Sequence, residues 1–177
     1  MINRRRILTN SDDIVIDIHH PDYLYVEFST TSDNTNRNLW YAVYADTAIL
    51  DGSTVPSASL YYSSQYSGVK VPTAGNHTLY AKPRSWTSNS RTYRPYGTDK
   101  LVILNTESNV VRQSSAHANL RTLVCLSTTS PTFTYAYTNF TKMESVLVPK
   151  EAVAAYKAAF PQWKSIIKGV VFNIIND

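Results

Sequence analysis

The stretch Ser145–Lys168, SVLVPKEAVAAYKAAFPQWKSIIK, combines the local signals of a strand and of a helix. Ser145–Val148 is a short run of strand-forming residues that ends at Pro149. Proline cannot donate to a strand ladder, but it fits the first turn of a helix. Apolar residues then recur at helical spacing, at Val153, Tyr156 and Phe160. The stretch therefore predicts a strand, a helix that begins at Pro149, and a buried helix face.

The end of this stretch predicts how the helix stops and what covers it. Pro161 ends the helix, and Trp163 continues the apolar pattern over a second, shorter turn. Gly169 is expected to act as the C-terminal cap of that turn. We expect Trp163 to fold back over the strand and to seal the end of the unit, while Lys157 faces solvent.

Residues 120–167 resemble the C-terminal unit of BspA-like leucine-rich repeat proteins. The resemblance rests on LRTLVCLSTTSPTF (120–133), FTKMESVLVPKEAVAAYKAAF (140–160) and WKSI (163–166). In that family a turn similar to CLSTTSP (125–131) leads to a strand, then to a helix containing AYKAA, and then to a closing tryptophan. The resemblance implies a small β/α cap with Leu120, Leu123 and Leu126 in its core. A period of about 23 residues is not recognised upstream, so we expect an added module and no horseshoe.

The composition predicts a folded and mainly β chain. It contains 177 residues, of which 43% are hydrophobic and 17% charged, as in ordinary globular proteins. The 13 tyrosines exceed the 5 phenylalanines, which favours strands with one wet face, where a phenol packs its ring and keeps its hydroxyl solvated. The tyrosine content therefore indicates sheets that are exposed on one side.

Runs of alternating or apolar residues predict about six strands in the first two-thirds of the chain. They lie at residues 14–18, 23–28, 39–45, 58–62, 78–82 and 101–104. Turn residues separate them, and no helix is expected among them. We predict an antiparallel β-sandwich. The run GNHTLY at residues 75–80 resembles the glycine turn that precedes a late strand in immunoglobulin-like domains, which implies a sandwich of that type. A further strand is expected at residues 170–175.

These elements suggest four segments. Residues 1–11 are expected to form a basic N-terminal arm, and residues 12–105 the β-sandwich domain. Residues 106–119, which contain few hydrophobic residues, are expected to form a linker, and residues 120–177 the leucine-rich-repeat-like cap. We expect the arm to be mobile until a partner orders it.

Charge gathers in two places where a partner could bind. The net charge is only +4, but residues 61–100 hold six basic residues and one acidic residue. The candidate partner-binding residues are Arg4, Arg5 and Arg6 of the arm, and Arg84, Trp86, Arg91, Tyr93, Arg94 and Tyr96 of the middle segment. The middle segment suits a solvated hairpin loop, a protein interface or a nucleic-acid platform. Because no nucleic-acid-binding motif accompanies it, nucleic acid is the least favoured partner.

The sequence offers no recognisable catalytic, cofactor or metal site. We find no nucleophile elbow, glycine-rich phosphate loop or HExxH pattern, and we expect no enzymatic activity. His19, His20 and Asp22 are the densest group of possible metal ligands, but adjacent strand residues point to opposite faces, so no metal site is expected there. His77 and His117 stand alone and are expected to be surface or packing residues. Cys125 is the single cysteine, which agrees with synthesis in a reducing compartment.

Two function classes remain. The arrangement of a sandwich, a lone BspA-like cap and an MINRR start is similar to virion proteins of tailed phages of gut anaerobes. That resemblance implies a virion structural protein with an assembly or surface-attachment role, made in the host cytoplasm. Its expected partners are other virion proteins and copies of itself, with no insertion into a membrane. The missing hydrophobic region of a secretion signal favours this reading. The alternative is a bacterial cell-surface or glycan-binding adhesion module that uses Tyr and Trp on a wet sheet face.

Overall fold

The structure is a computed structural model of the chain. It describes residues 12–21, 23–30, 35–41, 45–56, 58, 60–62, 66–83, 91–93, 98–103, 109–111, 120–130, 132–133 and 140–176. Of the predicted partner-binding residues, Arg4, Arg5, Arg6, Arg84, Trp86, Arg94 and Tyr96 lie outside these ranges, as does the arm at residues 1–11. Arg91 and Tyr93 lie in a strand of which only the backbone is described.

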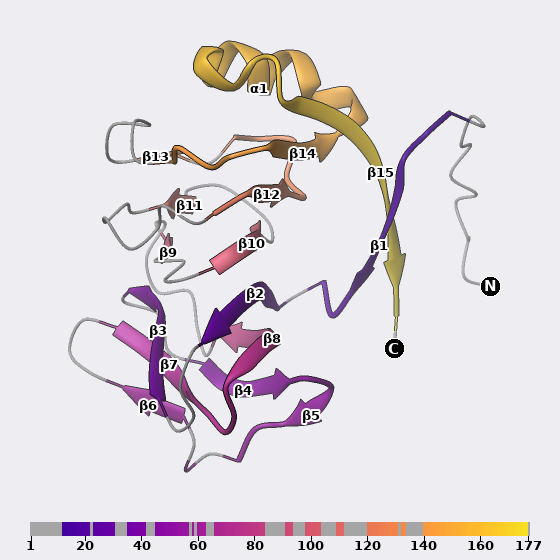
Figure 1. The fold of residues 1–177 in the computed structure, drawn as a ribbon. Helices are drawn as coiled ribbons and strands as arrows, with labels where there is room; N and C mark the ends of the chain where they lie inside the picture. The colour runs from indigo at the N-terminus through magenta and orange to yellow at the C-terminus, as the bar shows by residue number, and fades with distance from the viewer. Residues whose placement is uncertain are drawn as a thin grey trace.

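Two sheets make up most of the described chain, and the predicted mainly β fold is confirmed (Figure 1). The first sheet has the order β1 (Val15–His19), β15 (Ile167–Ile175), β14 (Ser145–Pro149), β12 (Thr122–Cys125), β10 (Thr98–Ile103), β2 (Leu24–Thr30), β8 (Gly75–Pro83), β4 (Ala45–Leu50) and β5 (Ser53–Thr54). The second has the order β13 (Thr132–Phe133), β11 (Asn109–Val111), β9 (Arg91–Tyr93), β3 (Thr35–Tyr41), β7 (Tyr66–Val71) and β6 (Leu60–Tyr62).

The first half of the chain pairs its strands antiparallel. In the first sheet β2 pairs with β8, and β8 pairs with β4. In the second sheet β7 lies between β3 and β6. Alternation along β2 sends Val26 and Phe28 to the interior and Tyr25 and Glu27 to the opposite face. The predicted antiparallel pairing therefore holds for the strands from β2 to β8.

The second half of the chain pairs its strands parallel, and it alternates between the two sheets. In the first sheet Leu101 of β10 pairs with Leu123 of β12, which pairs with Val146 of β14, which pairs with Ile167 of β15. In the second sheet β9, β11 and β13 also pair parallel. Successive partners in the first ladder are 22, 23 and 21 residues apart. We expected no period of about 23 residues upstream of the C-terminal unit, and one strand there, β10, joins the ladder of the unit at a spacing of 22 residues.

Both sheets continue past the boundary that was predicted from composition. Residues 109–111, within the range expected to be a linker, form β11 and pair with β9 and β13. Strand β10, placed in the sandwich segment, pairs with both β2 and β12. One hydrophobic core runs through both halves, because Val26, Leu79, Leu123 and Tyr156 belong to the same cluster of buried residues.

The first strand is an edge strand of the first sheet. β1 was predicted to belong to the antiparallel sandwich, but it pairs parallel with β15, from Val15 opposite Val171 to His19 opposite Ile175. The β1–β15 ribbon runs along one side of the stack of strands (Figure 1). Long-range pairing decides this position, so the alternation of residues 14–18 could predict the strand but not its neighbour.

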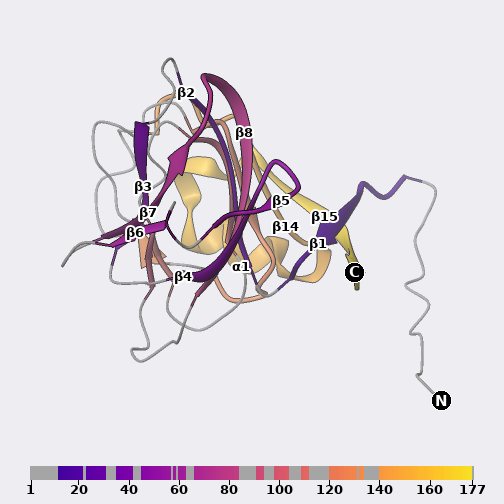
Figure 2. The same cartoon turned by 90° about the horizontal axis from the view of Figure 1, so that it is seen from below.

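The predicted C-terminal strand and helix are present. Pro149 ends β14, a 3₁₀ turn spans Lys150–Ala152, and α1 spans Val153–Ala159. The helix lies across one end of the stack (Figure 1), and in the view from the opposite end it appears behind the strands (Figure 2). Tyr156 and Phe160 are buried, and Val153 packs against the core from a partly buried position. The inward face predicted from helical spacing is therefore confirmed.

Gly169 does not cap a helix, as was predicted, because it lies within β15 opposite Val148. The helical region ends earlier, at the 3₁₀ turn Pro161–Trp163. A Cβ atom on Gly169 would lie 2.8 Å from Val153 Cγ2 and 3.1 Å from Lys150 Cα. Glycine at this position lets the strand approach the start of the helix closely.

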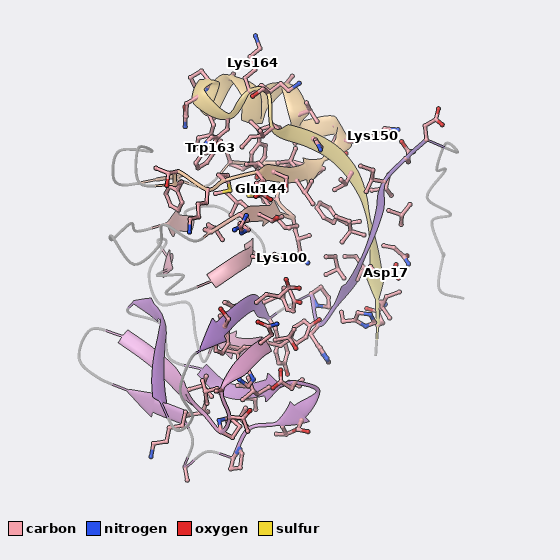
Figure 3. The ribbon with its side chains drawn as sticks, viewed as in Figure 1. Asp17, Lys100, Glu144, Lys150, Trp163 and Lys164 are labelled. Atoms are coloured by element: carbon pink, nitrogen blue, oxygen red, sulfur yellow. The ribbon has the colours of Figure 1, made fainter. Side chains whose placement is uncertain are left out.

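Trp163 packs beneath the helical region, against aromatic side chains (Figure 3). Its ring centroid lies 5.8 Å from that of Phe140 and 5.5 Å from that of Phe160. Next to it, the Tyr156 hydroxyl donates to the carbonyl oxygens of Ser127 and Thr129. These hydrogen bonds tie α1 to the turn that follows β12.

Cys125 belongs to the same core and is fully buried. The sequence left open whether this thiol is packed or exposed, and the structure packs it. Burial raises the pKa of Cys125 to about 12, so the thiol stays protonated and unreactive at neutral pH.

Candidate functional site

A patch of aromatic rings covers the outer surface of the first sheet where β2 and β8 lie side by side. We call it the tyrosine face and define it by His20, Tyr23, Tyr25 and Tyr80. Tyr25 and Tyr80 are directly opposite each other in the β2–β8 ladder, and their ring centroids are 4.7 Å apart. His20 contacts Tyr80 edge to face at 4.9 Å and Tyr23 at 5.2 Å. The four rings therefore form one continuous cluster, in which the planes of neighbouring rings are inclined by 43° to 71°.

A tight turn places His20 in this cluster. His20 has a φ angle of 50°, and its carbonyl oxygen accepts a hydrogen bond of 2.9 Å from the Tyr23 amide. Left-handed backbone is uncommon outside glycine, but histidine is among the residues that adopt it more readily. The turn between β1 and β2 therefore brings a histidine, weighed above as a metal ligand, into an aromatic cluster. Asp22, its proposed companion ligand, lies outside the described residues.

Two charged side chains border the tyrosine face, and a third lies on the neighbouring β1–β15 ribbon. Lys100 of β10 lies with its ammonium 5.2 Å from the centre of the Tyr25 ring and donates to Glu27 Oε1 at 3.4 Å. The Tyr25 hydroxyl donates to the same carboxylate oxygen. Burial and the Glu27 carboxylate raise the pKa of Tyr25 far above its ordinary value, so its phenol stays neutral and keeps donating. Asp17 of β1 accepts a 2.8 Å hydrogen bond from the side-chain amide of Asn173.

The β1–β15 ribbon supplies the opposite wall of the site. A pocket of about 90 Å³ lies between the ribbon and the face, lined by Ile16, Asp17, Ile18, His19, Tyr25, Tyr80, Lys100 and Val124. Asp17 and Lys100 come from its two sides (Figure 3). Val124 is buried beside the face, where Tyr25, Phe172 of β15 and Leu147 of β14 pack against it. An ion pair between Lys150 and Asp13 anchors the chain just before β1.

A second polar cluster joins the turn after β4 to β8. His77 Nδ1 lies 2.7 Å from Asp51 Oδ2, and His77 Nε2 donates to the Thr73 carbonyl oxygen at 2.8 Å. Asp51 Oδ1 accepts from the Thr78 amide at 2.8 Å. His77 is 5% exposed and packs against Phe28, so both of its ring nitrogens are used inside the fold. The expectation that His77 is a packing residue or a surface residue is resolved in favour of packing.

We predict that Asp51→Ala lowers the free energy of unfolding by about 1 to 3 kcal/mol, because it removes a partner of buried His77 and of the Thr78 amide. Asp51→Asn is the matched control, because asparagine also tolerates the left-handed backbone that Asp51 adopts, with φ 49°. Urea unfolding followed by circular dichroism measures both variants. If Asp51→Ala were as stable as the parent chain, the cluster would have no structural role.

Sequence reasoning missed the tyrosine face as a site. The alternation YLYVEF in residues 23–28 does predict that Tyr23, Tyr25 and Glu27 share one side of a strand. It gives no sign that Tyr80, Lys100 and Asp17 lie beside them, because these residues come from three other strands. The predicted arginine and aromatic segment cannot be compared with this site, since most of it lies outside the described ranges.

Among the described residues, no three His, Cys, Asp or Glu side chains gather as a metal site would require. No helix in the described part of the chain is long and apolar enough to cross a membrane. Comparisons with protein-family models, with curated proteins and with solved structures find no match.

Proposed function

We propose that the chain is a non-enzymatic virion protein of a tailed phage with a surface-attachment role, and that the tyrosine face is its recognition surface. The observation that carries the attachment role is the cluster of four rings bordered by Lys100 and Glu27. Aromatic rings with a few convergent polar groups are the ordinary composition of a binding site. The virion setting rests on the resemblance described under Sequence analysis.

The same proposal extends to the finer architecture. The parallel rungs of β10, β12 and β14, followed by α1 and Trp163, would be units of a BspA-like leucine-rich repeat. The spacings of 22, 23 and 21 residues support this, because leucine-rich repeats run from about 20 to 29 residues. The antiparallel strands β2 to β8 would be the immunoglobulin-like part, supported by two sheets that share one core. The repeat units would thus extend the sandwich along both sheets.

A homo-oligomer in the particle is also part of the proposal. β1 and β5 end the first sheet, and apolar Ile14, Val15 and Ile174 are exposed at the β1 end. Exposed edges with apolar side chains commonly pair with another chain. Light scattering of the purified protein at micromolar concentration would give a multiple of 19.9 kDa, and a monomer there together with a single copy per particle would contradict this part.

The alternative function is a bacterial cell-surface or glycan-binding adhesion module, which the tyrosine face supports equally well. The two functions share binding chemistry and differ in where the protein is found. Mass spectrometry of purified phage particles, compared with isolated host envelopes, distinguishes them. The virion proposal expects the chain in particles at a fixed ratio to the other virion proteins, and finding it only in envelopes would contradict that proposal.

The attachment role itself is tested on cells. The purified protein, labelled with a fluorophore, should bind intact host cells, and the Tyr80→Ala variant should bind at least about tenfold more weakly. Failure of the parent chain to bind any host cell would contradict the attachment role.

A further inference from the structure

We propose that the tyrosine face binds neutral pyranose sugars of a cell-surface glycan, with one sugar ring against Tyr80 and its hydroxyls bonded by Lys100 and Glu27. This inference rests on the proposed attachment function and names the ligand class of that site.

The Tyr80 ring suits the apolar face of a sugar. The axial C–H groups of a pyranose present a flat, slightly positive surface, and aromatic rings present a negative face to it. Tyr25 and Tyr80 come from two paired strands with their ring planes inclined by 46°, and His20 contacts Tyr80 at 71° while the Lys100 ammonium lies over the Tyr25 ring. Tyr80 is therefore the ring that a sugar would contact. Rings held in place lose little freedom on binding, so more of the stacking energy remains as affinity.

The border suits the hydroxyls of the same sugar. A lysine ammonium has three protons, and the Lys100 bond to Glu27 uses one of them. A carboxylate accepts about four hydrogen bonds, and the two that Glu27 receives from Tyr25 and Lys100 both involve Oε1. The Lys100 ammonium and the Glu27 carboxylate therefore place a donor beside an acceptor, as vicinal hydroxyls require, because each hydroxyl both donates and accepts.

The charge of the border excludes anionic ligands. Among the described residues that line the pocket, Lys100 is the one lysine or arginine, and Glu27 already pairs with it. Asp17 adds a second carboxylate, so these three groups together carry one negative charge at neutral pH. A phosphate, a sulfated or sialylated glycan, or a nucleic acid backbone needs a surplus of positive charge. A neutral sugar meets no such penalty.

The size of the pocket selects how the ligand lies. At about 90 Å³ the pocket is smaller than the 300 to 1,000 Å³ or so of a site that encloses a whole small molecule. A sugar would insert one edge between Tyr80 and Ile16 of the ribbon and leave its other hydroxyls in solvent. An internal or terminal residue of a long glycan fits this arrangement, and its affinity for a single sugar would be weak.

The test is titration calorimetry and a glycan array with the parent chain, using neutral oligosaccharides of glucose, galactose, mannose and N-acetylglucosamine, and sulfated and sialylated counterparts. We expect neutral sugars to bind and anionic sugars to bind no better than neutral ones.

Tyr80→Ala should weaken sugar binding at least about tenfold, whereas Tyr80→Phe, which keeps the ring, should stay within about threefold of the parent affinity. Lys100→Met should also weaken binding, and Lys70→Ala is its matched control, an exposed lysine of β7 outside this pocket. Circular dichroism checks that each variant folds. If Tyr80→Ala does not fold, the comparison of sugar binding by Lys100→Met with that of the parent chain is the test.

Four outcomes overturn the sugar proposal: preference for anionic glycans, binding only to protein or nucleic acid, equal binding by Tyr80→Ala, or no sugar binding. Periodate treatment of host cells separates this failure from failure of the proposed function. If the chain binds untreated and periodate-treated cells equally, the ligand is not a glycan but the attachment role stands. If it binds neither sugars nor cells, the attachment role falls as well.

Discussion

Trp163→Ala should destabilise the chain by about 3 to 5 kcal/mol, because it removes a buried aromatic side chain that packs against both Phe140 and Phe160. That loss is a large share of the roughly 5 to 15 kcal/mol that holds a domain together. We therefore expect the variant to be insoluble or to unfold at a much lower urea concentration than the parent chain. Urea unfolding followed by tryptophan fluorescence and circular dichroism measures the difference.

Lys164→Ala is the matched control, because Lys164 is the next residue and points away from the core (Figure 3). An exposed substitution of this kind should change the free energy of unfolding by no more than about 0.5 kcal/mol. If the Trp163 and Lys164 variants were equally stable, the inward face of the C-terminal unit would be misassigned.

Leu123→Ala should destabilise the chain by about 2 to 5 kcal/mol and should affect both halves of it. Leu123 is fully buried, and its strand lies between β10 and β14 with Leu101 and Val146 as register partners. Because one core cluster includes residues from β2 to α1, we expect loss of this side chain to weaken the whole stack together. Thr128→Ala, at an exposed turn position, is the control and should be near neutral.

Amide hydrogen exchange of the Leu123→Ala variant shows how far the effect reaches. Faster exchange in β2 and β8 as well as in β12 and β14 is the expected result, since local openings follow cooperative units. If exchange increased only in residues 120–177, the two segments predicted from composition would be independent folding units after all.

Local signals explain why the C-terminal stretch was predicted well. Pro149 and Pro161 restrict the backbone wherever they stand, and the spacing of Tyr156 and Phe160 identifies a helix face without reference to the rest of the fold. Gly169 was misread for the same reason. A glycine after a helix usually caps it. Gly169 instead lies so close to Lys150 and Val153 that a side chain would not fit, and no local sequence pattern reveals this contact.

The parallel ladder had a signal in the sequence that was overlooked. LVIL at residues 101–104 and LVCL at residues 123–126 are each followed by a polar residue and threonine, at a separation of 22 residues. The third member, VLVP at residues 146–149, breaks the motif because it leads into a helix. The intervening strands of the second sheet, such as β11 and β13, span only two or three residues, which is too short for a pattern to stand out.

The tyrosine face depends on parts of the chain that are distant in sequence. Alternation places Tyr25 and Glu27 on one side of β2, and this much follows from residues 23–28. The position of Lys100 depends on pairing with β10, and that of Asp17 depends on the parallel ribbon with β15. A single sequence predicts the members of such a face strand by strand, but only the register brings them together.

The most direct test of the tyrosine face as a recognition surface is nuclear magnetic resonance of the labelled chain, titrated with neutral polysaccharide from the host envelope. We expect the largest chemical-shift changes at Tyr25, Tyr80, Lys100 and Asp17, with little change at Lys70. Changes concentrated on the exposed edge near Ile174, or in the segment around Arg91 and Tyr93, with none on the four predicted residues, would contradict it.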